Sequence, residues 1–243
     1  MHVHQMSRRA HGSGTGSGYG RDVSVTRPAP AGDGTRERLV AAAAGLFAER
    51  GVDAVSLREI TRAAGARNAS ALQYHFGDRA GLVRAVLAPH HADVEARRHA
   101  LLDAVEDADG TDLATLASAL VRPSAARLAD RPGGPAYLRI VADLLDRPRP
   151  AISPAALEDP SDSMFRWRAL VAPLMAPEAV ALHRRFAAYR LMAAQLAQRA
   201  RSGPHTDDRL FTSDLVDMVA AVLAAPLSDA TRRLAEARGR ATG

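Results

Sequence analysis

Ala66–Phe76 reads ARNASALQYHF, and this short run decides which fold the chain is expected to take. Leu72 and Phe76 stand four residues apart and give two apolar anchors to a helix that we expect from about Asn68 to Tyr74. Asn68, Ser70, Gln73 and Tyr74 carry polar side chains that both donate and accept hydrogen bonds. The run therefore predicts a short helix with a polar outer face.

A longer amphipathic helix precedes this run. Leu39, Ala43, Leu46 and Phe47 recur at helical spacing and form a stripe that must be buried on one side. Gly51 follows at the place where a C-terminal cap belongs.

A second, shorter helix begins at a capping box, since Ser56 is followed three residues later by Glu59. It carries Leu57 and Ile60 inward, and the small residues of Ala63–Gly65 close it so that the next helix can cross nearby. A helix, a short helix, a tight turn and a polar helix form the pattern of a helix-turn-helix that reads DNA.

Composition excludes several kinds of chemistry. All 32 basic residues are arginine, which excludes a phosphate-loop lysine or a lysine Schiff base. The absence of cysteine excludes disulfides, thiolate zinc sites and cysteine nucleophiles. The net charge of +5 favours a polyanion partner only weakly. No apolar run reaches the roughly 18–20 residues of a membrane span, and we expect a cytoplasmic protein.

The remaining chain predicts helices only. Residues 1–33 are rich in Gly, Ser, Pro and Arg and are expected to form a disordered tail. Asp78 caps a long helix that reaches about Glu106 and is kinked by Pro89, and this helix connects two regions. Further helices follow, among them a long one from Pro177 to about Ala200 and another over Ser213–Ala224. The expected fold class is all-α.

The segment from Arg36 to Leu87 resembles the DNA-binding segment of the tetracycline-repressor (TetR) family of bacterial transcriptional regulators. The motifs that carry the resemblance are Leu46-Phe47 with Gly51, Ser56-Leu57-Arg58-Glu59-Ile60, Ala63-Ala64-Gly65 and Tyr74-His75-Phe76-Gly77-Asp78-Arg79. The resemblance implies a three-helix helix-turn-helix DNA-binding domain over residues 34–80. It also implies a larger helical effector-binding and dimerisation domain over residues 81–243.

The base-edge candidates are short polar or forked side chains on or before the third helix, namely Arg67, Asn68, Ser70 and Gln73. The resemblance assigns the DNA backbone to Tyr74, His75, Arg79 and the backbone amides around Ser56 and Leu57. Structural alternatives stay open for several of them: Tyr74 could pack on the first helix, His75 could cap locally, and Arg67 could be a solvated turn charge.

The C-terminal domain, by the same resemblance, binds a small effector and forms a homodimer. Its ligand-binding candidates are mainly aromatic: His99, Tyr137, Met164, Trp167, His183, Phe186 and Tyr189. Its interface candidates lie on the last two long helices: Phe186, Leu191, Ala194, Ala197, Val219 and Val222. Core packing within one subunit is the alternative for every member of both sets.

The expected function is a repressor that leaves an inverted-repeat operator when an effector binds, without a cofactor, a metal ion or a membrane partner. Two alternatives stay open: a helical ligand-binding module without DNA binding, and a nucleoid-type DNA-binding protein without a specific operator. We find no coherent nucleophile–base or metal constellation, so an enzyme is not expected.

Overall fold

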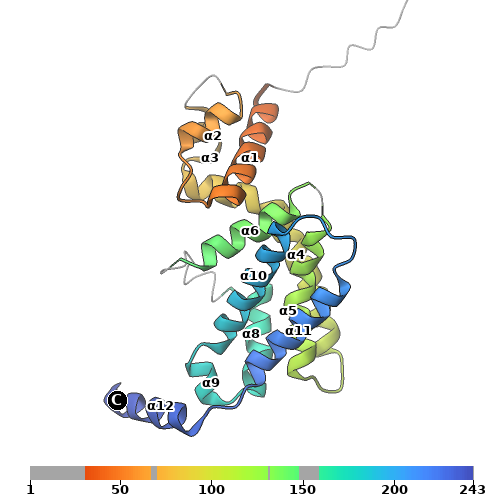
Figure 1. The fold of residues 1–243 in the computed structure, drawn as a ribbon, viewed down its shortest axis with the longest axis vertical. Helices are drawn as coiled ribbons and strands as arrows, with labels where there is room; N and C mark the ends of the chain where they lie inside the picture. Colours follow the sequence, from red (N-terminus) through yellow and green to blue (C-terminus); the bar gives the residue numbers. More distant parts are fainter. Residues whose placement is uncertain (1–30, 67–69, 131, 148–158, 243) are drawn as a thin grey trace, which may run out of the picture.

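The computed structural model describes residues 31–66, 70–130, 132–147 and 159–242, and within these ranges it contains helices and no strand. Three helices form a small domain at one end of the molecule, and the others form a longer body below it (Figure 1). The all-α prediction is confirmed. Arg67 and Asn68 lie outside the described residues, as does most of the expected tail over residues 1–33.

The small domain, called the reader below, consists of α1 (Ala31–Arg50), α2 (Leu57–Ala63) and α3 (Ala71–Phe76). Its core is a cluster of apolar side chains that includes the predicted stripe except Leu46, which is partly buried and packs against it: Leu39, Ala43, Phe47, Val52, Val55, Ile60, Ala64, Leu72, Leu82, Val86 and Ile140. Most of these residues come from the first 90 positions, but Ile140 is contributed by a helix of the body.

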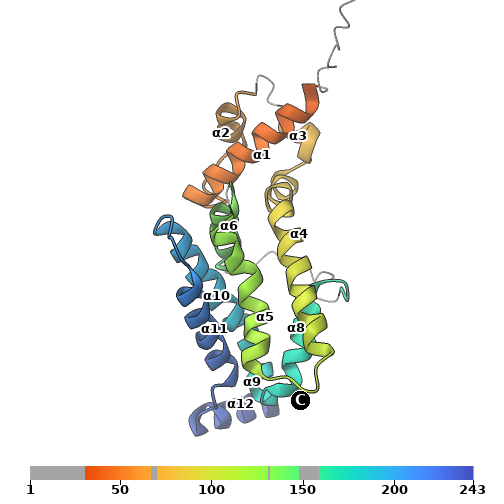
Figure 2. The same ribbon diagram turned by 90° about the vertical axis from the view of Figure 1, so that its right-hand side faces the viewer.

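A single long helix, α4 (Arg79–Glu106), runs from the reader down the body (Figure 2). The Asp78 side chain accepts a hydrogen bond from the Gly81 amide at 2.7 Å, which caps its first turn as predicted. Pro89 lies inside the helix, so one backbone hydrogen bond is lost without ending it.

The body is a bundle of helices around one apolar core. Besides α4, its helical segments are α5 (Leu113–Ala125), a 3-10 turn (Ala126–Leu128), α6 (Gly134–Leu145), α8 (Ser163–Val171), a 3-10 turn (Ala172–Leu174), α9 (Pro177–Ala181), α10 (Arg184–Arg201), α11 (Arg209–Ala224) and α12 (Asp229–Thr242). Helix α10 packs mainly on α6, and α11 packs on α5. Trp167 is completely buried, and its Nε1–H donates to the Leu116 carbonyl at 2.8 Å.

Three expected helix boundaries are wrong. The helix predicted from Pro177 to Ala200 is broken at His183, whose φ of 57° is left-handed and incompatible with a continuous helix. Helix α11 begins at Arg209 rather than Ser213, because the Asp207 carboxylate accepts the Arg209 amide at 2.8 Å. The third helix begins at Ala71, not near residue 68.

The first helix also begins before the expected domain start at residue 34, because α1 extends back to Ala31. Among the described residues, no single helix is long and apolar enough to cross a membrane. One bent pair, Arg209–Ala224 with Asp229–Arg238, satisfies length and composition together and is bent by 57° at its break.

Candidate nucleic-acid interface and ligand cavity

Polar side chains gather on the outer face of α3. Ser70, Gln73 and Tyr74 stand at i, i+3 and i+4, and all three are exposed, Tyr74 to 85 %. Leu72 on the opposite side is only 2 % exposed and anchors the helix in the reader core. The high exposure of Tyr74 shows that its ring does not pack on α1. A hydroxyl, an amide and a phenol are therefore presented together at the surface.

The C-terminal end of α3 carries the next two rings. His75 lies edge-on to Tyr74, with ring centroids 5.1 Å apart, and is partly buried. Phe76 is half-buried rather than fully buried, and the guanidinium of Arg36 lies 5.5 Å from its ring centroid. Arg36 is exposed and was not among the predicted contacts. It places a cation from α1 beside the reading helix.

The turn between α2 and α3 is set by Gly65. Its φ of 61° is left-handed, and its amide donates to the Arg62 carbonyl while the Ala66 amide donates to the Thr61 carbonyl, both at 3.0 Å. These two bonds form a Schellman motif, which ends α2 and turns the chain toward α3. The small-residue closure predicted for this turn is confirmed.

The start of α2 is stabilised by the predicted capping box. Ser56 Oγ accepts the Glu59 amide at 3.2 Å, and Glu59 Oε2 accepts the Ser56 amide at 2.8 Å. Arg50 forms an ion pair with the same carboxylate at 2.9 Å. The Ser56 amide is therefore engaged inside the protein, whereas the amides of Leu57 and Arg58, in the first turn, have no acceptor within the helix.

Glu59→Gln is expected to reduce the loss of stability on acidification. Hydrogen bonds from the Ser56 amide and then from Arg50 lower the pKa of Glu59 from 4.5 to about 2. The ionised carboxylate therefore stabilises the fold above pH 4.5, and this contribution is lost as the pH falls toward 2. Glutamine retains an acceptor for the Ser56 amide but does not titrate.

Urea unfolding of both proteins at a series of pH values checks this expectation. The difference in unfolding free energy between wild type and the Gln variant should be largest near neutrality and should shrink below the ordinary carboxyl pKa. A difference that does not change with pH would contradict it.

Arg79 has a structural role besides the one predicted for it. Its Nη1 donates to the carbonyls of Val52 and Val55 at 2.6 and 2.7 Å, which ties the start of α4 to the segment between α1 and α2.

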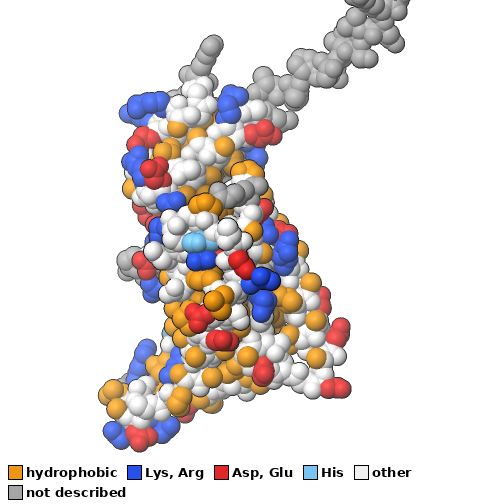
Figure 3. Space-filling view, turned by 45° about the vertical axis from the view of Figure 1, so that its right-hand side comes forward, with side chains coloured by type: hydrophobic (Ala, Val, Ile, Leu, Met, Phe, Trp, Pro, Cys, Tyr) orange, Lys and Arg blue, Asp and Glu red, His pale blue; other side chains and the backbone are white. Residues whose placement is uncertain are grey.

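Over the reader end of the face drawn in Figure 3, basic and acidic side chains are interspersed rather than gathered into one basic patch. The geometry of α3 therefore supports DNA reading better than net charge does.

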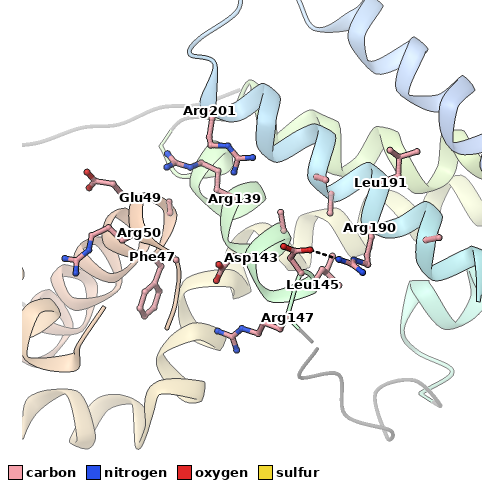
Figure 4. A pocket seen from close by; sticks show the side chains of 17 residues that line it. Phe47, Glu49, Arg50, Arg139, Asp143, Leu145, Arg147, Arg190, Leu191 and Arg201 are labelled. Carbon is pink, nitrogen blue, oxygen red and sulfur yellow. Dashed lines mark hydrogen bonds and ion pairs between the residues drawn. The ribbon is translucent and has the colours of Figure 1, made fainter. Parts of the chain in front are cut away.

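Helix α6 connects the reader to the body. Ile140 is completely buried in the reader core, and Asp143 Oδ2 accepts the Val52 amide at 3.0 Å. Arg147 reaches Asp53 at 2.8 Å. Figure 4 shows Asp143 of α6, and Arg147 two residues after the end of α6, extending toward the end of α1 beside a hollow of about 850 Å³.

The opposite side of α6 belongs to the body. Tyr137 and Leu138 are buried in the body core, and Val141 packs against it. Desolvation by burial raises the pKa of Tyr137, and the same cause raises that of Tyr189, so both phenols stay neutral over the physiological range. One helix therefore contributes to both cores.

A cavity of about 490 Å³ lies between α8 and the start of α10. Five of the seven predicted ligand-binding residues line it: Met164, Trp167, His183, Phe186 and Tyr189. Tyr137 instead lines a smaller adjoining cavity of about 20 Å³, which shares His91, Met164 and Tyr189 with the larger one. The sequence therefore predicted five of the eleven described residues that line the larger cavity.

His99 is a correction to the predicted ligand set. It lines neither cavity, because its ring is held between α4 and α8: Nδ1 lies 2.8 Å from Arg166 Nη1, and Nε2 lies 3.1 Å from the Ser161 carbonyl. These contacts make His99 part of the packing between the two helices.

Residues 39–86 match the family model described as "Bacterial regulatory proteins, tetR family". The matched segment is therefore a DNA-binding segment of the TetR type, and it supports a DNA-binding transcriptional regulator. The matched segment contains most of α1, all of α2 and α3 and the first turns of α4, which form the reader described above.

Solved structures with a similar helical arrangement include AmtR of Mycobacterium smegmatis, with 20% identity and a TM-score of 0.48, covering 88% of this chain and 97% of that one. The probable transcriptional regulatory protein RHA5900 shows 22% identity and a TM-score of 0.49, covering 79% and 100%. NalD of Pseudomonas aeruginosa, the secondary repressor of the MexAB-OprM multidrug efflux pump, shows 20% identity and a TM-score of 0.48, covering 80% and 98%. No curated protein matches the chain.

The predicted interface residues separate into two groups. Ala194 is exposed on α10, and Phe186, Leu191 and Val222 are partly exposed on α10 and α11. Ala197 and Val219 have no exposed surface, so within this fold they are core residues and cannot contact a second subunit. The apolar stripes of these helices face inward at those two positions.

Several residues that position the reader or line the cavity were not predicted: Arg36, Asp143, Phe165, Arg168 and Arg185. Arg168 and Arg185 belong to α8 and α10, and their proximity depends on how these helices pack. The sequence offered a signal only for Arg36, which lies one turn before the apolar stripe of α1.

Proposed function

We propose that this TetR-family regulator reads an inverted-repeat operator as a homodimer and is released from it by a small-molecule effector. In this proposal Ser70 and Gln73, with Arg67 and Asn68, contact base edges. Tyr74, His75, Arg79 and the amides near Ser56 and Leu57 contact the DNA backbone. The observation that carries the proposal is the exposed polar face of α3 on a reader whose core is completed by the body helix α6.

Helix α6, which contributes to both cores, can couple effector binding to DNA binding. Leu145, in the last turn of α6, lines the 490 Å³ cavity, while Ile140 and Asp143 of the same helix contact the reader. An effector that shifts α6 or α4 therefore changes how the reader is held. A coupling free energy of about 1–3 kcal/mol is typical for such a link.

The geometry of DNA favours a dimer. Two reading helices about 34 Å apart reach successive major grooves of an inverted repeat. The outer faces of α10 and α11, with Ala194, Leu191, Phe186 and Val222, are the proposed contact. The proposed division of the chain is a tail over residues 1–33, a DNA-binding domain over 34–80 and an effector-binding and dimerisation domain over 81–243, in a protein that acts in the cytoplasm.

The decisive experiment tests whether the protein protects the DNA upstream of its gene and of the neighbouring gene from nuclease cleavage. A protected palindrome, together with a dimer by light scattering at micromolar concentration, is the expected result. Equal affinity for all DNA would instead identify a nucleoid-type protein. No DNA binding at all, in a folded protein, would leave only a ligand-binding module.

Gln73→Ala is expected to weaken operator binding by about 1–3 kcal/mol while changing binding to scrambled DNA little. The reason is that a base-edge contact discriminates between sequences, whereas the exposed Gln73 amide makes no contribution to the reader core. Binding titrations on both DNAs at two salt concentrations measure the effect.

Arg79→Ala is the matched comparison. It removes the two hydrogen bonds to the carbonyls of Val52 and Val55 and should weaken binding to both DNAs alike. Equal losses on both DNAs for the Gln73 variant would exclude Gln73 from the base-reading set.

A further inference from the structure

The hollow of about 850 Å³ beside α6 lies where the reader meets the body. Its walls are the end of α1 with Gly51, the second half of α6 and one side of α10 (Figure 4). Among the described lining residues, it shares only Leu145 with the 490 Å³ cavity, so the two are separate sites. Leu191 and Ala194, proposed above as dimer contacts, also line it, which places the hollow beside the second subunit of the proposed dimer.

Arginines from three parts of the chain line this hollow: Arg50, Arg139, Arg147, Arg190 and Arg201. Three of them have a carboxylate partner, and these pairs are Arg50–Glu59, Arg147–Asp53 and Arg190–Asp146. Arg139 and Arg201 form no ion pair within the part of the chain that the structure describes. These two guanidinium groups therefore remain available to an added anion.

The side chains of Arg139 and Arg201 are directed toward each other. Arg139 belongs to α6 and Arg201 is the last residue of α10, and Figure 4 shows both guanidinium groups at the same side of the hollow. Nε of Arg139 is buried without a hydrogen-bond partner, and Arg201 donates to the neutral side chain of Gln198 at 3.2 Å. Two like charges repel each other in this arrangement, and an anion between them would reverse the effect.

The negative groups nearby are engaged or directed elsewhere. Asp143 Oδ2 accepts the Val52 amide at 3.0 Å, and Figure 4 shows the carboxylate of Glu49 turned away from the two guanidinium groups. The end of α1 adds about half a negative charge through its helix dipole, which is less than the charge of either arginine. The side of the hollow at Arg139 and Arg201 therefore keeps its positive charge.

We propose that the hollow binds a small phosphate-bearing anion between Arg139 and Arg201, as a second ligand site besides the effector cavity. Forked guanidinium groups on two helices can bind the oxygens of a phosphate from different directions, whereas a planar carboxylate takes its donors in one plane. The volume is in the range usual for small-molecule sites. Phe47, the aromatic residue of the described lining, is only 1 % exposed, so the site recognises the phosphate rather than a ring.

The position of the hollow gives such a ligand a regulatory consequence, which rests on the proposed function. An anion held by α6 and α10 lies against the end of α1, the first helix of the reader. Its binding therefore favours one position of the reader on the body and changes operator affinity. A ligand that binds two states unequally shifts the equilibrium between them.

The test measures binding of inorganic pyrophosphate to the full chain by calorimetry, with malonate at the same ionic strength as the carboxylate comparison. We expect pyrophosphate to bind about tenfold more tightly than malonate. Arg139→Gln and Arg201→Gln should each weaken pyrophosphate binding about tenfold, because each removes a charge-assisted contact. Arg201 is exposed, so the variant at this position keeps the test valid if Arg139→Gln does not fold.

Arg209→Gln is the matched control. It removes the same charge from the chain, but Arg209 is exposed, pairs with Asp207 and lies outside the hollow. Its effect on pyrophosphate binding should be negligible. Equal affinity for pyrophosphate and malonate overturns the phosphate class. Pyrophosphate binding that both arginine variants leave unchanged overturns the hollow as the site, because the anion then binds another basic surface.

Operator titrations with and without pyrophosphate test the regulatory consequence. We expect operator affinity to change about fivefold in the wild type and not at all in Arg201→Gln. An unchanged affinity in the wild type overturns the regulatory link, as does a change that persists in Arg201→Gln, which indicates competition at the DNA-binding face. Arginine-dependent pyrophosphate binding in a protein without operator preference supports the site and contradicts the proposed function.

Discussion

Ile140→Ala is expected to lower the free energy of unfolding by about 2–5 kcal/mol, the usual range for deleting a large aliphatic side chain from a core. Ile140 has no exposed surface and lies in the reader core although it belongs to α6 of the body. The deletion leaves a cavity at the contact between the two parts. We therefore expect weaker binding to all DNA as well as lower stability, because α6 no longer holds the reader firmly.

A graded series makes this expectation sharp. Ile140→Val removes one methyl(ene) group and should cost about 0.5–1.5 kcal/mol. The neighbouring Val141 faces the body core, so Val141→Ala should destabilise the protein without the same loss of DNA affinity. Urea denaturation and DNA titration of the three variants measure both effects. An Ile140→Ala variant with wild-type DNA affinity would show that α6 does not hold the reader.

This prediction depends on a feature that the apolar pattern of α6 does not contain. Tyr137, Ile140, Val141 and Leu144 recur at helical spacing and predict one buried stripe. In the structure Ile140 and Leu144 pack on the reader, whereas Tyr137 and Val141 pack on the body. The periodicity of apolar residues predicts which positions are buried. It does not predict which helix each buried position contacts, because that depends on how helices far apart in the sequence pack.

Local signals in the reader were sufficient for the order of its helices and for the caps between them. The capping box at Ser56 and Glu59, the C-terminal cap at Gly51 and the small-residue closure at Gly65 depend on atoms a few residues apart, and all are present as predicted. The break at His183 has no such signal. Neither glycine nor proline marks it, and a histidine takes a left-handed conformation there.

The aromatic lining of the cavity could be predicted from the sequence, but the arginines of the lining could not. Scarce aromatic residues in an alanine-rich chain are natural candidates for a ligand site, and Trp167, Phe186 and Tyr189 line it. Arg168 and Arg185 are indistinguishable in the sequence from the many exposed arginines. Only the packing of α8 against α10 brings them together.

Trp167→Ala is expected to produce the largest loss of stability, about 3–5 kcal/mol. The side chain is completely buried in the body core, and its Nε1–H satisfies the Leu116 carbonyl of α5 at 2.8 Å. Truncation leaves a large cavity and removes this hydrogen bond. Trp167→Phe should cost less, because it keeps an aromatic ring and loses mainly the donor, worth about 1–3 kcal/mol for a buried group.

Phe165→Ala is the matched control on the same helix. Phe165 is half-buried and lines the cavity, so its removal should affect the affinity of an aromatic ligand more than stability. Trp167 lies in the body core and not in the reader core, so its truncation should destabilise the body first. Thermal unfolding, followed by circular dichroism and by DNA binding, distinguishes the two variants. Equal stability of the Ala variants at positions 165 and 167 would contradict the assignment of Trp167 to the core.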